Sequence, residues 1–266
     1  MDLYTDNFDR LSNLPDGSIK EIFSYPRGHW FCKPNKKLKE SVQRFVRRTG
    51  NSIPICVIYF IPNRDLGSFS KGGARSEQRY IEYVTQFAEG LGTKEAIVIF
   101  EPDAIPHAIM QGGDLLDERI SLINRALLVL KQCCPNACVY VDVGHPRWIS
   151  HKVISKTLKK VYNYRGISIN VSNFIPTKEC IRFGVSIGEH FVIDTSRNGN
   201  DSISEEDGWC NPNGRKLGDR PRLVDDHILL DALLWIKVPG ESDGKMNGGP
   251  KAGVFWKEYA EGLLNE

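Results

Sequence analysis

The 266-residue sequence lacks several features that would place it in a large class of proteins. It contains no run of about 18 apolar residues, the length that a membrane-spanning helix needs. Residues 1–6 have neither a basic start nor an apolar stretch, so they do not predict a signal peptide. The 35 basic and 33 acidic residues leave a net charge of only +2, without the basic excess typical of nucleic-acid binding. We therefore expect no nucleic-acid partner and no membrane segment.

Sequence motifs for common cofactors are also missing. No GxGxxG follows the first apolar strand pattern and no GxxxxGK[ST] occurs, which disfavours dinucleotide and nucleoside-triphosphate sites. HxH and HExxH are absent as well, but metal-dependent hydrolysis stays open because Asp, Glu and His all bind divalent cations. Metal-dependent hydrolysis predicts that EDTA abolishes the activity. The sequence itself favours a site without a cofactor.

Cysteine occurs in a pattern that suits neither a complete set of disulfides nor a zinc site. The count is seven, so at least one thiol stays unpaired within the chain. The string Cys133-Cys134-x3-Cys138 has no second cysteine pair and no histidine nearby, which disfavours structural zinc. We expect no metal and, at positions such as Cys56, buried free thiols.

What the sequence does contain is a regular alternation of strand and helix patterns. Apolar runs predict strands at 30–32, 56–60, 96–100, 138–141, 167–171, 191–193 and 233–236, with a weaker one at 3–5. Spacings of three and four predict helices at 77–91, 115–131 and 148–162. Continuous apolar strands are typical of a parallel sheet buried on both faces. We expect one domain, 1–266, folded as an α/β barrel that is closed or nearly closed.

Polar side chains follow these strands at the point where each one ends. The carboxylates among them are Asp65, Glu101, Asp103, Asp142, Asp194, Glu241 and Asp243. In an α/β barrel the chemistry collects at the carboxyl ends of the strands. Two carboxylates kept in different protonation states are the working parts of glycosidic bond hydrolysis. Asp65 and Asp103, on adjacent strands, are expected to form such a pair, because one negative charge raises the pKa of the other group.

Six ordered sequence blocks then carry a family resemblance. They are YFIPNRD at 59–65, IFEPD at 99–103, VDVGH at 141–145, NVSN at 170–173, DGWCN at 207–211 and KVPGESDG at 237–244. In this order they resemble glycoside hydrolase family 6, the family of endoglucanases and cellobiohydrolases that act on cellulose. The resemblance implies a distorted, TIM-barrel-like α/β barrel with fewer than eight closed parallel strands. It also implies a β-1,4-glucan substrate and hydrolysis with inversion, without a covalent intermediate.

The same resemblance assigns roles to single residues. Asp103 matches the proton donor, and Asp65 matches the carboxylate that raises the pKa of the donor and helps to organise the water. Asp243 matches the position proposed as the base, and Tyr59 a tyrosine that presses on the distorted sugar. Ser70, in the glycine-rich stretch 67–73, is our candidate for holding the lytic water. The expected sugar contacts are the platforms Trp30, Trp148 and Trp209, together with Lys237, Glu241, His145, Asn170 and Asn173.

The chain also departs from the family pattern in its cysteines and loops. Leu66 and Lys245 stand where family members have disulfide cysteines, so both bridges are expected to be lost. That loss and the missing signal peptide favour an intracellular place, whereas the resemblance favours an extracellular one if the chain is a trimmed domain. Short loops at 65–80 and 244–255 predict an open cleft and cleavage of internal bonds. We expect a monomer.

The main alternative is a non-catalytic or weakly active glucan-binding accessory domain, linked to cellulose synthesis or remodelling. The lost disulfides favour it. Asp65, Asp103 and Asp243 are all present, however, and binding alone needs no buried pair of acids. The sequence therefore favours the endoglucanase.

Overall fold

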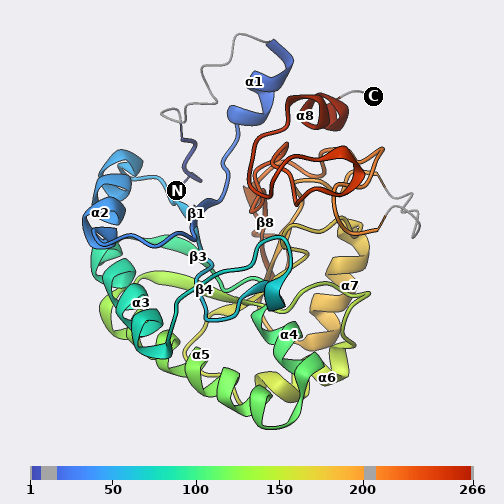
Figure 1. Ribbon diagram of the computed structural model, residues 1–266. Coiled ribbons are helices and arrows are strands. Elements are labelled where there is room, and N and C mark those ends of the chain that lie inside the picture. The colour runs from blue at the N-terminus through green and yellow to red at the C-terminus, as the bar shows by residue number, and fades with distance from the viewer. Residues whose placement is uncertain (1, 7–16, 201–207, 265–266) are drawn as a thin grey trace.

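The computed structural model describes residues 2–6, 17–200 and 208–264, and its centre is one curled sheet (Figure 1). Within these residues the sheet has eight strands in the order β1-β2-β3-β4-β5-β6-β8-β7. All neighbours are parallel except β7, which runs antiparallel to β8. The strands are β1 (His29–Phe31), β2 (Ile55–Ile58), β3 (Ala96–Phe100), β4 (Ala137–Asp142), β5 (Gly166–Ile169), β6 (Phe191–Asp194), β7 (Arg222–Leu223) and β8 (Leu230–Leu234).

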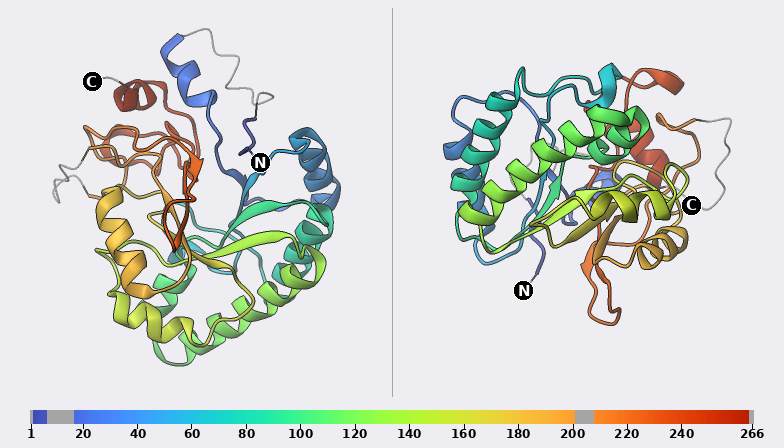
Figure 2. Two further views of the ribbon diagram at one scale, coloured as in Figure 1. Left: turned by 180° about the vertical axis from the view of Figure 1, so that it is seen from behind. Right: turned by 90° about the horizontal axis from the view of Figure 1, so that it is seen from below.

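Helices lie in the connections between the successive parallel strands from β1 to β6, and they surround the outside of the sheet (Figure 1). Figure 2 shows the same arrangement from behind and from below, with the β7–β8 hairpin projecting from the body of the barrel. The expected alternation of strands and helices is thereby confirmed. The helices are α1 (Gly17–Phe23), α2 (Leu38–Thr49), α3 (Glu77–Leu91), α4 (Ala104–Gln111), α5 (Gly113–Cys133), α6 (His151–Leu158), α7 (Thr177–Ile187) and α8 (Lys257–Leu264).

The two ends of the parallel sheet meet without forming a regular strand pair. The Gly28 N–H, just before β1, donates to the Trp235 carbonyl, just after β8, at 2.8 Å. A Cβ added at Gly28 would lie 2.2 Å from the Ile236 carbonyl oxygen, so only glycine permits this approach. The Trp30 indole N–H donates to the same Ile236 carbonyl at 2.9 Å. The predicted distorted barrel, with fewer than eight closed parallel strands, is confirmed.

The strands are buried on both faces, as their continuous apolar runs predicted. In β2 and β3 successive side chains alternate between the barrel interior and the layer under the helices. Val57 and Ile99 point inward, whereas Ile58 and Phe100 pack in the outer layer with Phe87 of α3. Full burial of an aliphatic or aromatic side chain contributes about 1.5–3 kcal/mol, so this double core holds the strand ends in place.

Several expected elements differ in detail from those observed. The weak strand expected at 3–5 is a single bridge between Leu3 and Ile53. The helix expected at 148–162 is shorter, because α6 begins only at His151 and ends at Leu158. Helices α1, α2, α4, α7 and α8 were not predicted. By contrast, α3 has the predicted bounds, with the Ser76 hydroxyl accepting the Arg79 N–H at its start.

The seven cysteines are all free, so neither family disulfide is present. Leu66 and Lys245, which stand at two of the bridge positions, are both exposed. In the described part of the chain, no helix combines the length and the apolar character needed to cross a membrane. The same residues contain no cluster of three or more His, Cys, Asp or Glu side chains placed to hold a metal ion.

Candidate active site

Asp103 lies directly after β3, at the start of α4. Its φ of +66° is in the left-handed region, which non-glycine residues seldom adopt. Its side chain is half-buried, and its backbone N–H donates to Asp142 Oδ1 at 2.8 Å. Burial and the negative charges of Asp142 and Asp65 raise the pKa of the Asp103 carboxyl well above its usual range. A carboxyl that keeps its proton in this way is suited to act as a general acid.

Asp142, at the end of β4, fixes the backbone of Asp103 through a hydrogen bond. It is only 1% exposed, and it accepts the Gly144 N–H at 3.0 Å and the Ser168 hydroxyl at 3.0 Å in addition to the Asp103 N–H. Burial raises the pKa of Asp142 to about 7. The carboxylate is therefore saturated by the protein itself, and it acts on Asp103 through its charge and by fixing its backbone.

Glu101 has a similar supporting role. It is 1% exposed, and its carboxylate accepts the Phe60 and Ile61 N–H groups at 3.0–3.1 Å. These bonds join the end of β3 to the end of β2, where the loop with Asp65 begins. Burial raises the pKa of Glu101 to about 7.

Asp194, at the end of β6, is fully buried and completes this pattern. Burial raises its pKa, although the bonds to its carboxylate act in the opposite direction. Of the seven carboxylates expected at the strand ends, Glu101, Asp142 and Asp194 thus tie neighbouring strands together. The Asp194 carboxylate accepts four backbone N–H groups at 2.9–3.2 Å, those of Ser172, Ser196, Ile236 and Lys237.

Asp65 begins the loop 65–73, which follows β2. Its Oδ2 accepts the Ser70 N–H at 2.6 Å, and burial raises the pKa of its carboxyl. The Ser70 hydroxyl makes no hydrogen bond with the described residues and can accept or donate one to a ligand. Arg64 fixes the loop, because its guanidinium donates to the Ser70 carbonyl at 2.8 Å, to the Cys32 carbonyl at 2.7 Å and to the Tyr59 carbonyl.

Tyr59 lies between the loop 65–73 and the aromatic ring of Trp30. The Arg64 guanidinium stands 4.6 Å from the centre of the Tyr59 ring, and the Trp30 ring meets Tyr59 edge-on at 5.7 Å. Burial and the charges of Asp103 and Asp65 raise the pKa of the Tyr59 hydroxyl, so it stays protonated. Tyr59 and Asp65, from one sequence block, and Asp103, from the next, therefore act on one another in one place.

Asp243, in the segment after β8, is held by a buried cation. Arg197 is fully buried, and its Nη1 donates to Asp243 Oδ2 at 2.8 Å. The Asn211 N–H donates to the same oxygen at 3.2 Å, while Lys237 Nζ lies 3.8 Å from Oδ1. Oδ2 is therefore occupied by two donors, and Oδ1 is the oxygen that remains for a water or a substrate.

Arg64, Arg197 and Asn211 hold this site, and sequence reasoning gave none of them a role. Asn211 closes a loop around Asp243, because its Oδ1 accepts the Asp243 N–H at 2.7 Å and its amide donates to the Gly244 carbonyl at 2.7 Å. Arg64 and Asn211 lie inside two of the blocks that carry the family resemblance, at 59–65 and 207–211, and this was the available signal. Nothing in the sequence around Arg197 marks its partner 46 positions away.

Two predicted platforms are accessible to a ligand. Trp209 is 51% exposed and its ring lies 5.9 Å from that of Phe69, in the loop 65–73. Phe69 also packs on Gly244, where an added Cβ would lie 2.5 Å from the Phe69 ring, so this loop touches the segment of Asp243. Trp148 is half-buried, with its indole N–H 3.0 Å from the Met110 sulfur.

His145 lies beside Trp148, their rings 5.7 Å apart. Burial and the charge of Arg147 lower the pKa of His145 to about 4, so the imidazole is neutral at ordinary pH. Its Nδ1 is buried without a hydrogen-bond partner in the described residues. A neutral imidazole can donate or accept one hydrogen bond with a sugar hydroxyl.

The remaining predicted sugar contacts differ in what they can offer. Lys237 Nζ lies 3.7 Å from Glu241 Oε2, so these two residues stand together beside Asp243. Asn173 is half-buried, with its amide donating to the Val171 carbonyl at 2.9 Å. Asn170 is fully buried. Its amide nitrogen donates to the carbonyls of Ile175 and Asp194, and its Oδ1 accepts the Ile175 N–H in the loop after β5. It shapes that loop and has no exposed polar atom for a sugar.

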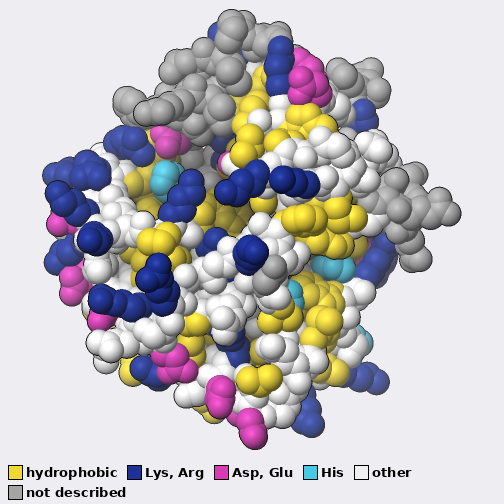
Figure 3. Space-filling model, viewed as in Figure 1, with side chains coloured by type: hydrophobic (Ala, Val, Ile, Leu, Met, Phe, Trp, Pro, Cys, Tyr) yellow, Lys and Arg dark blue, Asp and Glu magenta, His cyan; other side chains and the backbone are white. Residues whose placement is uncertain are grey.

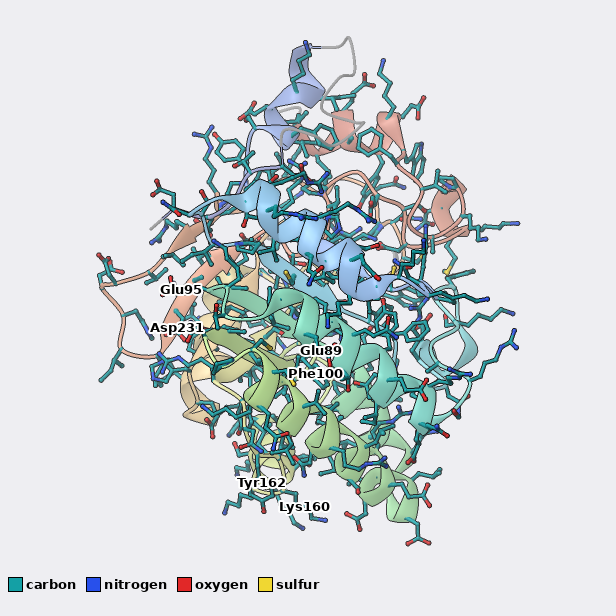
Figure 4. The ribbon with its side chains drawn as sticks, turned by 90° about the vertical axis from the view of Figure 1, so that its left-hand side faces the viewer. Glu89, Glu95, Phe100, Lys160, Tyr162 and Asp231 are labelled. Atoms are coloured by element: carbon teal, nitrogen blue, oxygen red, sulfur yellow. The ribbon has the colours of Figure 1, made fainter. Side chains whose placement is uncertain are left out.

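Two other features lie outside this site. The string 184–188, GVSIG, matches GxSxG, but it lies inside α7 with the Ser186 hydroxyl bonded to the Arg182 carbonyl. It is therefore not the strand-to-helix turn of a nucleophile elbow. A cavity of about 220 Å³ lies at the opposite, amino ends of the strands, with Glu95 and Asp231 among its lining residues (Figure 4). None of the predicted site residues lines it.

Comparison with known proteins agrees with this arrangement. The family model described as "Glycosyl hydrolases family 6" matches residues 9–266. Endoglucanase A of Cellulomonas fimi is 45% identical over 218 residues, 78% of this chain and 46% of that protein. Endoglucanase 1 of Streptomyces halstedii is 38% identical over 229 residues, 80% of this chain and 70% of that protein. The chain thus spans about half the length of the Cellulomonas fimi relative.

Among solved structures, the chain is similar to the endoglucanase Cel6 from Mycobacterium tuberculosis, determined in complex with methyl-cellobiosyl-4-deoxy-4-thio-β-D-cellobioside. The TM-score is 0.91 at 36% sequence identity, and the match covers 99% of this chain and 96% of that one. The GH6 enzyme of Orpinomyces sp. Y102 matches with a TM-score of 0.79 at 27% identity, over 99% of this chain and 95% of that one. The match to the family model, the relatives and the shared fold together show that this chain belongs to glycosyl hydrolase family 6.

Proposed function

We propose that this protein hydrolyses internal β-1,4-glucosidic bonds of cellulose or a related β-glucan, with Asp103 as the general acid. The observation that carries the proposal is the environment of Asp103, a half-buried carboxyl between Asp142 and Asp65 whose pKa is raised. A general acid needs a proton at the working pH and access to the leaving oxygen, and this position supplies both. The substrate class follows from the relatives that are named endoglucanases.

The attacking water is proposed to lie by the loop 65–73. In this loop the Ser70 hydroxyl has no hydrogen-bond partner among the described residues. The Ser70 N–H donates to the Asp65 carboxylate and holds it in place. The proton of the attacking water would pass to Asp243, whose Oδ1 is the oxygen that is not bonded to Arg197. An inverting mechanism requires the acid and base carboxyls to stand about 6.5–9.5 Å apart, with the water between them.

Sugar rings are proposed to stack on Trp30, Trp148 and Trp209. A pyranose has apolar C–H faces and a rim of hydroxyl groups, so flat indole rings suit its faces. Lys237 and Glu241, paired at 3.7 Å, and neutral His145 suit its hydroxyls. Asn173 is retained as a hydroxyl contact, whereas Asn170 is left out because it is fully buried.

Cleavage of internal bonds is proposed because the loops around Asp65 and Asp243 are short. Phe69 of the first loop contacts Gly244 of the second, and we propose that this contact opens to admit a chain from the side. Incubation with a soluble β-glucan tests the proposal, with viscosity and reducing ends measured together. We expect the viscosity to fall early while few ends are released, and NMR to show the α-anomer as the first product. Release of no reducing sugar would leave the alternative of a glucan-binding accessory domain.

A further inference from the structure

Three segments at neighbouring strand ends carry basic residues and no acidic ones. They are 32–37 after β1, 68–76 after β2 and 244–253 after β8. The chain as a whole has a net charge of +2, and these three segments hold seven positive charges. The other residues therefore have a net charge of −5. The acidic stretch 201–207 lies outside the described residues. The seven basic residues are Lys33, Lys36, Lys37, Lys71, Arg75, Lys245 and Lys251.

All seven of these side chains are exposed, and none forms an ion pair or a side-chain hydrogen bond with a described residue. Elsewhere on the surface some cations, among them Lys39, Arg79 and Lys160, have acidic partners within 2.9 Å. Figure 3 shows Lys and Arg side chains across the middle of the face that carries the loop 65–73, with Asp and Glu mainly at its margins. The segments therefore expose positive charge that the described residues do not neutralise.

The three segments are also joined to one another and to the candidate site. Arg64 links the first two, because its guanidinium bonds the carbonyls of both Cys32 and Ser70. Phe69 links the second to the third through its contact with Gly244. Lys33 and Lys237 both lower the pKa of the Cys32 thiol, although its burial outweighs them, which places the first segment beside the Lys237–Glu241 pair. The second segment also meets one of the predicted sugar platforms, because the Phe69 ring lies 5.9 Å from that of Trp209.

We propose that the substrate of this site is a β-1,4-glucan that bears anionic groups, such as carboxylate, sulfate or phosphate esters. The inference rests on the proposed glucan hydrolysis and specifies its substrate class. A neutral glucan offers the lysines only hydroxyl groups, whereas an anionic one also offers negative charge that offsets their mutual repulsion. Indole faces can hold the sugar ring while flexible lysine side chains reach the anionic substituents at its edge. A surface of one sign also raises the local concentration of an oppositely charged chain.

The test compares two soluble substrates of similar length, carboxymethylcellulose and neutral hydroxyethylcellulose. The quantity measured is the selectivity, kcat/KM on the anionic substrate divided by kcat/KM on the neutral one. It is measured at about 0.01 M and about 0.15 M salt, where the Debye length is about 30 Å and about 8 Å. We expect the selectivity of the unmodified protein to fall as salt rises. Cellulose sulfate and phosphorylated cellulose, used in parallel, rank the anionic groups.

A variant with three glutamines, K33Q/K36Q/K37Q, tests the residues directly. We expect its selectivity at low salt to fall about 3- to 10-fold, the combined worth of three exposed charge pairs. The matched control K131Q/K156Q/K159Q changes the net charge equally, in the last turns of α5 and α6 and just after α6, and should leave the selectivity unchanged. Equal selectivity in all three proteins, independent of salt, would overturn the inference. Failure to cleave either substrate would instead overturn the proposed function.

Discussion

The Asp142 carboxylate accepts the backbone N–H of Asp103 at 2.8 Å, and it is itself almost completely buried. This bond holds the backbone of Asp103 in its left-handed conformation. Burial raises the pKa of the Asp103 carboxyl, and the negative charges of Asp142 and Asp65 raise it further. Asp142 therefore contributes both to the position and to the pKa of the proposed catalytic group.

Replacing Asp142 with asparagine should separate these two effects. Asp142→Asn retains an oxygen that can accept the Asp103 N–H but removes the negative charge. Because that charge raises the pKa of Asp103, its loss lowers this pKa, and the alkaline limb of the pH profile should move to lower pH. The measurement is kcat/KM on soluble β-glucan against pH. An alkaline limb at the same pH in both proteins would show that Asp142 has no electrostatic role.

Phe69 is expected to position the loop that holds Asp65 and Ser70. It packs on Gly244, and its ring lies 5.9 Å from that of Trp209, so it ties this loop to the segment of Asp243. Phe69→Ala should lower kcat about 10-fold, within the roughly 100-fold that a misplacement of about 1 Å can cost. The melting temperature should change little, because Phe69 is 40% exposed. Phe69→Tyr, which keeps the ring, is the control, and an equal loss of kcat in both variants would contradict the role.

Arg197 is predicted to be required for folding stability as well as for the site. Arg197→Met leaves the Asp243 carboxylate without its buried cation, a change that typically costs about 3–5 kcal/mol. The free energy of unfolding in urea measures this loss. In the double variant R197M/D243N most of the stability should return, while activity on β-glucan should not. A single variant as stable as the unmodified protein would contradict the account.

The stability of the protein should depend on pH through His145. Its pKa is about 4 in the folded protein and near 6.5 in the unfolded chain, so the unfolded chain binds more protons between these values. Stability that is fully present above pH 6.5 is therefore lost as the pH falls toward 4. His145→Gln should reduce the loss by roughly 2 kcal/mol, as measured by urea unfolding at about pH 4.5 and about pH 7.5. The same dependence in both proteins would assign it to other groups.

The core of the fold was predictable because its periodic patterns are local. Helix α3 combines apolar spacing with a Ser76 cap and a following Gly92, and both of its bounds were predicted. Helix α4 was missed because it starts directly at the left-handed Asp103, carries Pro106 in its first turn and has only eight residues. Its short, apolar sequence has no polar face that would reveal a helical period.

The roles of the carboxylates were less predictable than their positions. The carboxylates follow strands in the same manner, but only three of them, Asp65, Asp103 and Asp243, are candidates for catalysis. Three others are buried and accept backbone N–H groups; they are Glu101, Asp142 and Asp194. Whether such a carboxylate meets solvent or backbone N–H groups depends on how neighbouring strands are staggered. That stagger is a long-range property, as is the pairing of Arg197 with Asp243, and a single sequence does not display it.

Asp103 is proposed to supply the proton to the leaving oxygen of a β-1,4-glucan. The rate at which Asp103→Ala releases reducing ends from unactivated soluble β-glucan tests this role. We expect kcat to fall roughly 10²–10⁴-fold relative to the unmodified protein, the usual contribution of general acid catalysis. A correctly folded variant that retains most of its rate would show that Asp103 is not the acid.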